Sequence, residues 1–243
     1  MKTSRIFASL CALLLISFFS LQSVSAQRDT TAVKGIQFVR KASTSDQQKG
    51  WLLNGVAVSG NLLGVFLANF TSYGEYEAAL RLDFSERFFP IVEAGWGVCN
   101  KDNEETQLHY EAYAPYARIG LDYNFNKDRM SGNRIFGGFR VGFSSFKYDV
   151  SAQGVADPVW KTAMPFDYKG VSSNMLWMEL VFGLEAKIWK GFRLGWSARY
   201  RRRLHQKENE PGAAWYVPGF GHNDTHTFGG TFNLVFDIGK TSK

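Results

Sequence analysis

The chain has 243 residues, of which 16% are aromatic and 21% are charged, and its formal net charge is +6. A chain of this length corresponds to one folded domain, and so modest a positive charge gives no reason to expect a nucleic-acid partner. The high aromatic content is difficult to bury in an ordinary soluble domain and suits a surface that contacts lipid.

The first 26 residues predict a secretory signal peptide. Lys2 and Arg5 form a basic start, residues 6–24 are mainly apolar and uncharged, and small residues up to Ala26 match a signal-peptidase site. We therefore expect cleavage after Ala26 and treat an uncleaved membrane anchor as the weaker interpretation. Because Cys11 leaves with this segment, the mature chain keeps only Cys99 and forms no internal disulfide.

The remaining chain is expected to contain a polar lead-in and one barrel domain. The predicted division is a signal peptide over residues 1–26, a periplasmic lead-in segment over residues 27–50 and an outer-membrane β-barrel domain over residues 51–243. Within the barrel domain, segments of roughly ten residues alternate between apolar side chains and polar or small ones. Such segments, separated by turn residues, are typical of transmembrane β-barrels.

Alternation with a period of two predicts strands that have one apolar and one polar face. The last segment shows it best, since Phe228, Phe232 and Phe236 fall on one face and Thr227 and Asp237 on the other. Eight strands are expected over residues 51–67, 74–84, 88–99, 110–125, 134–149, 174–189, 192–204 and 226–239. The first is the weakest, because Leu62 to Leu67 are apolar without alternation and leave room for a bend or bulge.

The connections between these strands alternate in length. Those after the second, fourth and sixth strands are short, at residues 85–87, 126–133 and 190–191, whereas residues 150–173 and 205–225 form long connections. Short turns at one end and longer loops at the other are typical of outer-membrane barrels, whose turns face the periplasm. An even number of strands also places both ends of the barrel on the periplasmic side.

The two faces are assigned by volume. An eight-stranded barrel has an interior just wide enough to be filled by side chains, and rows such as Leu176, Leu180, Phe182 and Leu184 are too bulky for it. Glycine falls mostly on the charged face, where a narrow lumen needs small side chains. We therefore expect the apolar face to contact lipid and the charged face to line the lumen.

The lumen is predicted to be closed by ion pairs, because buried charges are tolerated when they are paired. The predicted charge network comprises Glu77, Arg81, Glu93, Arg118, Asp122, Arg140, Glu179, Glu185, Arg193, Arg199 and Arg201, with Asp83, Lys187 and Asp237 on the same face. In the hairpin of the sixth and seventh strands, Glu179 should lie near Arg199, Arg201 or Arg203, and Glu185 near Gly195 or Ser197. The row of arginines also suggests an anion site, but we favour charge-balanced packing.

Six segments carry a family resemblance. They are Tyr73–Glu77, Val92–Trp96, Gly138–Phe146, Trp177–Leu184, Trp189–Ser197 and Tyr216–Gly221. Together they resemble an uncharacterised family of small Gram-negative outer-membrane β-barrels, known as a domain of unknown function, and the resemblance extends over roughly residues 50–239. It implies a location in the cell outer membrane and a barrel fold, and it transfers no activity or catalytic residue.

The last strand also resembles an assembly signal. Thr227, Gly229, Phe232 and Leu234 resemble the carboxy-terminal pattern that barrel-assembly machinery recognises. The expected fold is therefore an all-β, closed, eight-stranded antiparallel transmembrane β-barrel with short periplasmic turns and longer outer loops. Its expected partners are outer-membrane lipid and lipopolysaccharide, barrel-assembly machinery, and a surface protein or glycan.

The histidines give the sharpest candidate for chemistry. His222 and His226 flank Asp224, a set that could hold a metal or activate water. Side chains four residues apart converge when they lie on a helix. Here, however, the two histidines fall at a junction between a loop and a strand, and we prefer the interpretation of a solvated loop. We expect no catalytic residue, metal site or cofactor.

The predicted role is structural or interactive and not enzymatic, through the two long outer loops. These loops carry Trp160, Phe166, Tyr168, Trp215, Tyr216 and Phe220, which could dock a surface protein or glycan. Three alternatives remain open: a narrow channel for small solutes or anions, a barrel enzyme that acts on lipid A or peptide, and a soluble periplasmic lipocalin-like binder whose apolar face points inward.

Overall fold

A computed structural model of the chain describes residues 53–103, 108–126, 132–156, 163–207, 209 and 212–238. The predicted signal peptide with its cleavage site at Ala26, the lead-in over residues 27–50, Trp160 and the side chain of Phe166 lie outside what is described. The barrel strands are β1 (Leu53–Asn61), β2 (Tyr73–Phe84), β3 (Phe88–Asn103), β4 (Leu108–Asn124), β5 (Arg134–Ala156), β6 (Ala163–Trp189), β7 (Phe192–Gln206) and β10 (His226–Ile238).

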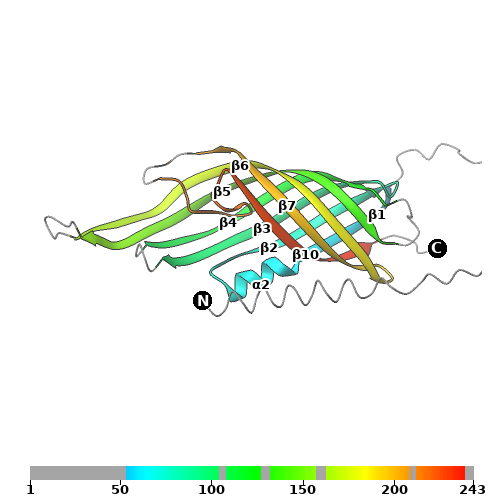
Figure 1. Ribbon diagram of the computed structural model, residues 1–243, viewed down its shortest axis with the longest axis horizontal. Helices are drawn as coiled ribbons and strands as arrows, with labels where there is room; N and C mark the ends of the chain where they lie inside the picture. Colours follow the sequence, from blue (N-terminus) through cyan, green and yellow to red (C-terminus); the bar gives the residue numbers. More distant parts are fainter. Residues whose placement is uncertain are drawn as a thin grey trace, which may run out of the picture. The chain divides into compact units, whose positions relative to one another are not determined.

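These eight strands close into an antiparallel barrel in the order β1-β10-β7-β6-β5-β4-β3-β2 (Figure 1). The predicted fold class is therefore confirmed. Helix α2 (Leu62–Phe70) follows β1, and a short hairpin of β8 (Tyr216–Val217) and β9 (Gly221–His222) lies in the connection from β7 to β10. The barrel closes through β1, which pairs with both β2 and β10.

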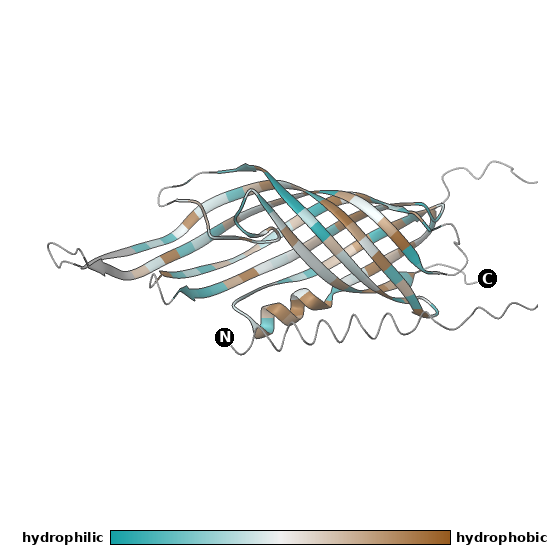
Figure 2. Cartoon of the chain, in the orientation of Figure 1, coloured by the Kyte–Doolittle hydropathy of each residue, from teal (hydrophilic) through white to brown (hydrophobic). Residues whose placement is uncertain are grey.

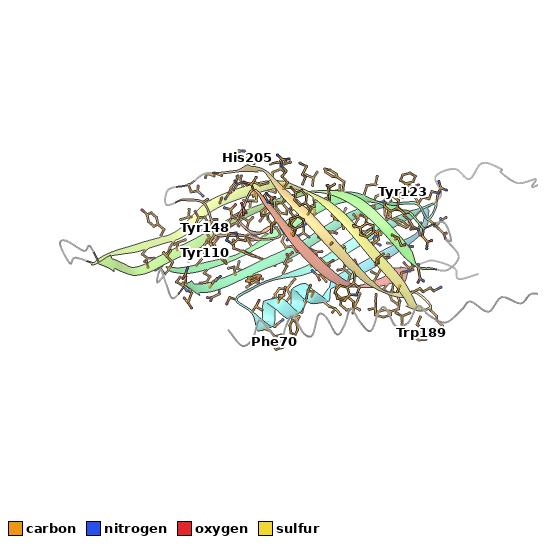
Figure 3. The ribbon with its side chains drawn as sticks, viewed as in Figure 1. Phe70, Tyr110, Tyr123, Tyr148, Trp189 and His205 are labelled. Atoms are coloured by element: carbon orange, nitrogen blue, oxygen red, sulfur yellow. The ribbon has the colours of Figure 1, made fainter. Side chains whose placement is uncertain are left out.

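The short connections lie together at one end of the barrel, called here the turn end; the opposite end is the loop end. The β2–β3 connection is a tight turn with Ser85 and Glu86 at φ values of 55° and 57°, the positive angles that favour a tight hairpin. Aromatic side chains gather at this end, where Tyr123 contacts both Phe88 and Phe125 at ring-centroid distances of 5.3 Å. Figure 3 shows Tyr123 and Trp189 at the turn end.

The apolar faces of the strands point outward. Along β6, Leu180, Phe182 and Leu184 are 58%, 55% and 48% exposed, whereas the intervening Val181 is 4% exposed. The same alternation follows the other strands, and it appears in Figure 2 as changes between hydrophobic and hydrophilic colouring along each one. So large an apolar exterior is costly in water and is the surface of a transmembrane barrel. It is the reverse of a lipocalin-like barrel, whose apolar face would point inward.

Helix α2 corrects the predicted first strand, which ends at Asn61 instead of residue 67. The Asn61 side chain accepts a hydrogen bond from the backbone N–H of Gly64 at 3.1 Å and so caps the helix. A strand over this run would place bulky side chains in the crowded lumen. As a helix, the run turns Val65, Phe66 and Phe70 outward at helical spacing.

Because β1 is short, α2 completes the barrel wall. The pairing of β1 stops at Asn61↔Asn233 on the β10 side and at Gly60↔Ala78 on the β2 side. Beyond those pairs, α2 lies against both β2 and β10 (Figure 1). Its backbone approaches β2 so closely that a Cβ on Gly74 would collide with the backbone of Ala68.

Among the residues that the structure describes, no helix combines the length and apolar character needed to cross a membrane.

The structure departs from prediction at one of the two long connections, since the other lies where expected, between Gln206 of β7 and His226 of β10. Most of residues 150–173 belongs to strands, since β5 and β6 continue to pair at Val150↔Tyr168 and Ser151↔Asp167. The last pair of β6 with β7 is Met175↔Gln206, so the β5–β6 hairpin projects about 12 residues further, or about 40 Å at the rise of a strand. The pairing shifts register between Tyr148 and Val150 and again between Ala152 and Val155, and such irregularities interrupt the side-chain alternation from which a strand is predicted.

Candidate functional site: the filled interior and its plug

The middle of the barrel holds a compact cluster of ion pairs centred on Arg118. Its Nε lies 2.9 Å from Glu179 Oε1, and its two terminal nitrogens lie 3.2 Å from carboxylate oxygens of Glu75 and Glu93. A fourth carboxylate, that of Glu77, also accepts a hydrogen bond from Arg118. One guanidinium therefore serves four carboxylates that come from β2, β3 and β6.

Two arginines on β7 complete this central cluster. Arg199 lies 2.8 Å from Glu93 and 3.2 Å from Glu77, and Arg201 Nε lies 3.4 Å from Glu179. The β6–β7 register places Arg201 directly opposite Glu179. Because alternate residues share a face, both arginines point inward from successive inward positions of one strand.

Toward the turn end, further pairs fill the lumen. Arg140 binds Asp122 through both terminal nitrogens at 2.8 and 3.0 Å and reaches Glu93 at 2.8 Å. Arg81 donates a hydrogen bond to Glu185 and lies 3.7 Å from Asp122. The arginines thus link strands that are far apart in the chain.

The turn end itself is closed by two more pairs. Arg134 lies 3.1 Å from Asp83, and Arg193 lies 2.7 Å from Asp237. All eleven residues of the predicted charge network are buried and lie in this system of pairs: Glu77, Arg81, Glu93, Arg118, Asp122, Arg140, Glu179, Glu185, Arg193, Arg199 and Arg201. Lys187, expected on the same face, is exposed at the rim.

Three members of the network were missing from the prediction. Glu75 pairs with Arg118 and Arg201, Arg134 pairs with Asp83, and the Tyr116 hydroxyl lies 2.8 Å from carboxylate oxygens of both Glu75 and Glu77. The alternation of side chains along the strands could have indicated two of these residues, because Glu75 shares a face with Glu77 and Tyr116 shares a face with Arg118.

The loop-end part of the interior is apolar, which corrects the prediction of a charged lumen throughout. Here the inward side chains form one buried cluster: Cys99, Tyr110, Ala112, Ala114, Tyr116, Phe146, Tyr148, Met175, Trp177, Ala214, Tyr216, Val217 and Phe220. Tyr110 stacks on Tyr148 with ring centroids 5.6 Å apart, and the ring of Trp177 meets Phe220 edge-on at 5.9 Å. An apolar ring therefore surrounds the mouth of the barrel.

Residues 214–221, which include the first strand of the β8–β9 hairpin and are called here the plug, fold into that mouth. Tyr216 is 2% exposed and Phe220 is fully buried, so the prediction that these two side chains are offered to a partner is wrong. Backbone carbonyls of the plug accept hydrogen bonds from the lumen arginines: Gly219 from Arg118 at 2.5 Å and Phe220 from Arg201 at 3.0 Å. The loop turns inward because the mouth of the barrel offers apolar contacts to its side chains and arginine N–H donors to its carbonyls.

Close packing against glycine fixes the position of the plug. A Cβ on Gly97 of β3 would lie 2.6 Å from Pro218 Cα, and a Cβ on Gly219 would overlap the ring of Tyr116. Gly219 also has a φ of 82°, a conformation that residues with a Cβ rarely adopt. The plug therefore requires glycine on both of the surfaces that meet.

The cavities found below the plug, in the described part of the barrel, are small. Two cavities, one beside Asn61 and Phe136 and one beside Phe89 and Arg134, each have a volume of about 10 Å³. That is roughly the space of one water molecule. The interior is therefore packed, with side chains and paired charges occupying the lumen.

The histidine and aspartate side chains considered for chemistry lie at the surface of the loop end. His222, Asp224 and His226 are all exposed, with His222 against the Trp215 ring at 5.1 Å and His226 against Tyr200 at 6.2 Å. Within the described ranges, no three His, Cys, Asp or Glu side chains are arranged to hold a metal ion. The Cys99 thiol is buried, and buried structural cysteines are generally unreactive.

The fold and the filled interior define a closed eight-stranded β-barrel of the membrane-spanning type, with an apolar exterior, a lumen of ion pairs and an inserted plug. The chain belongs to the family described as a domain of unknown function (DUF6048), whose model matches residues 3–238. No curated protein matches the chain.

Two solved structures are similar at 10% sequence identity. Neisserial surface protein A (NspA) aligns over 75% of this chain and 94% of its own, with a TM-score of 0.41. A major outer membrane protein from Thermus thermophilus aligns over 76% of this chain and 98% of its own, with a TM-score of 0.42.

Proposed function

We propose that this chain is an integral protein of the Gram-negative outer membrane whose closed, charge-paired barrel has a structural or surface-interaction role and no enzymatic one. The observation that carries the proposal is the described interior, in which ion pairs and the plug lie across the lumen and the two cavities found among them each have a volume of about 10 Å³. The apolar exterior would contact lipid and, in the outer leaflet, lipopolysaccharide. Insertion would depend on the barrel-assembly machinery, which the pattern at Thr227 to Leu234 suits.

The projecting β5–β6 hairpin is the part best suited to a partner. Beyond Met175, β6 still pairs with β5 on one side, and Lys207 hydrogen-bonds to Asn174 and Ser173 on the other; further out, over residues 163–172, that second edge has no strand beside it in the described structure. Open strand edges can pair with a strand of another protein. Tyr168 is exposed on this edge, next to the solvent-exposed pair of Lys169 and Asp167. We propose that the hairpin binds another surface component, a protein or a glycan.

Conductance in planar lipid bilayers tests the closed lumen. The purified, folded protein should give no discrete current steps, whereas an open porin added to the same membrane should. A variant in which residues 214–221 are replaced by a short glycine-serine linker should still show no large pore, because the ion pairs below the plug remain. Regular steps from the unmodified protein would disprove the closed barrel.

Removal of the hairpin tests the interaction. Tyr148 and Val171 are paired across β5 and β6, so replacing residues 149–170 by Asn-Gly joins them with a two-residue turn that suits a hairpin. The variant should keep the heat-modifiable gel mobility of a folded barrel and lose the products that chemical cross-linking yields on intact cells. If the products are unchanged in a folded variant, the hairpin is not the binding surface.

A further inference from the structure

A separate cavity lies at the loop end, outside the ion-pair network. It has a volume of about 330 Å³ and is lined by Lys101, Leu108, Tyr110, Tyr148 and Trp215, together with residues 212–213 beside the plug. This volume falls within the roughly 300–1,000 Å³ typical of small-molecule sites. The cavity is therefore large enough for a small ligand, in contrast to the cavities deeper in the barrel.

The aromatic walls of this pocket are held in place by hydrogen bonds of their own. Tyr110 stacks on Tyr148, and Trp215 meets Tyr110 edge-on at 6.1 Å. The hydroxyl of Tyr110 donates to the carbonyl of Tyr216 at 2.7 Å, and that of Tyr148 donates to the carbonyl of Gly212 at 3.0 Å. Figure 3 shows Tyr110 and Tyr148 close together near the loop end. Both rings are largely buried, and since both hydroxyls are satisfied, the parts of the rings that line the cavity are apolar surfaces held in fixed positions.

One cation completes the pocket. The Nζ atom of Lys101 lies 4.3 Å from the centroid of the Trp215 ring. The neighbouring Asp102 pairs instead with His109 at 2.6 Å, and no carboxylate in the described part of the chain pairs with Lys101. An ammonium group beside fixed aromatic surfaces favours a ligand that combines a flat apolar body with a negative charge.

We propose that this pocket binds a small planar, mainly apolar ligand that carries one anionic group, such as an aromatic carboxylate. The ring faces of Tyr110, Tyr148 and Trp215 would contact the ligand body, and Lys101 would pair with its anionic group. This site goes beyond the proposed function, because it takes a small molecule and depends neither on the ion pairs of the lumen nor on the open edge of β6.

A matched pair of probes tests both halves of the proposal. Naphthoate and its neutral amide, naphthamide, have the same ring system and differ in charge. Binding to the full chain in detergent micelles can be measured by calorimetric titration, with titrations into empty micelles subtracted. The protein should bind naphthoate saturably and more tightly than naphthamide. Lys101→Met should weaken naphthoate binding about tenfold or more and leave naphthamide binding unchanged.

The chain supplies a matched control for that substitution. Lys190 lies 5.2 Å from the Trp189 ring at the turn end, where the same residue types meet without this pocket. Lys190→Met should leave both affinities unchanged, whereas Trp215→Leu should weaken both ligands. Heat-modifiable gel mobility shows which variants are folded, and Lys101→Met alone decides the question if Trp215→Leu does not fold. Absence of saturable binding, or equal losses in Lys101→Met and Lys190→Met, would overturn the proposal.

Discussion

At the scale of single residues, the interior depends on guanidinium groups that each serve several carboxylates. Arg118 is 1% exposed and pairs with carboxylates from three strands. Removing charges from water is costly, and mutual pairing offsets that cost only while the partners remain in place. The loss of one arginine at the centre of the cluster therefore leaves several buried carboxylates without their main partner.

Replacement of Arg118 by methionine should lower the free energy of unfolding by about 3–5 kcal/mol, because it leaves uncompensated buried charges. The measurement is urea-induced unfolding of the protein in detergent or lipid vesicles, followed by gel mobility and tryptophan fluorescence. Lys169→Met is the control, since Lys169 pairs with Asp167 at 3.1 Å on an exposed surface and should cost less than about 1 kcal/mol. Equal and small effects of the two substitutions would contradict the role assigned to the cluster.

The sequence indicates the face of each charged residue, but only part of its pairing. Alternation fixes which side chains point inward, and register within a hairpin brings Glu179 opposite Arg201. The pair of Arg199 and Glu93 joins positions 106 residues apart, across a lumen whose geometry depends on how all eight strands are staggered. No local pattern contains that information, so such contacts could not be derived before the structure.

At the scale of elements, the plug and helix α2 are the features that the strand pattern does not reveal. Residues 214–221 have no hydrophobic period, so nothing local distinguishes an inserted loop from an exposed one. Residues 62–70 form a short apolar run. In so short a run, the spacing of hydrophobic residues cannot distinguish a buried strand from a helix. Asn61 resolves this ambiguity in the structure, since its side chain caps the helix at the point where β1 ends.

Enlarging Gly97 should displace the plug. A Cβ at this position would lie 2.6 Å from Pro218 Cα, and overpacking of this kind costs about 1–3 kcal/mol. In Gly97→Val, maleimide should therefore modify Cys99, which is 1% exposed and lies in one buried cluster with the plug in the unmodified protein, and mass spectrometry can map the product.

Gly230→Ala provides the comparison, because a Cβ there would meet only the Ser197 carbonyl, at an ordinary 3.7 Å. This variant should protect Cys99 as well as the unmodified protein does. If Gly97→Val protects Cys99 equally well while remaining folded, the plug does not depend on this contact.

At the scale of the whole molecule, the barrel separates an apolar exterior from an interior with nearly balanced charge. Among the described residues, the ion pairs of the lumen join seven arginines and eight carboxylates: Arg81, Arg118, Arg134, Arg140, Arg193, Arg199 and Arg201 with Glu75, Glu77, Asp83, Glu93, Asp122, Glu179, Glu185 and Asp237. Because these charges are paired with one another, they do not need water in the lumen to stabilise them. The exterior, by contrast, is stable only where hydrocarbon surrounds it.

An arginine placed on the outer face tests whether hydrocarbon surrounds the barrel. Phe182 is 55% exposed near the middle of the part of β6 that pairs with β7. Phe182→Arg should therefore lower the free energy of unfolding in phospholipid vesicles by about 2–4 kcal/mol, the cost of a cation near the bilayer midplane.

Ser172→Arg is the matched substitution, since Ser172 is exposed on the part of β6 that projects beyond β7. Water surrounds that position if the barrel spans the membrane as its surface indicates, so the change should alter the free energy of unfolding by less than about 0.5 kcal/mol. Unfolding in urea, measured in vesicles for both variants, gives the comparison. An arginine tolerated equally well at both positions would mean that the β6 surface at Phe182 does not face hydrocarbon.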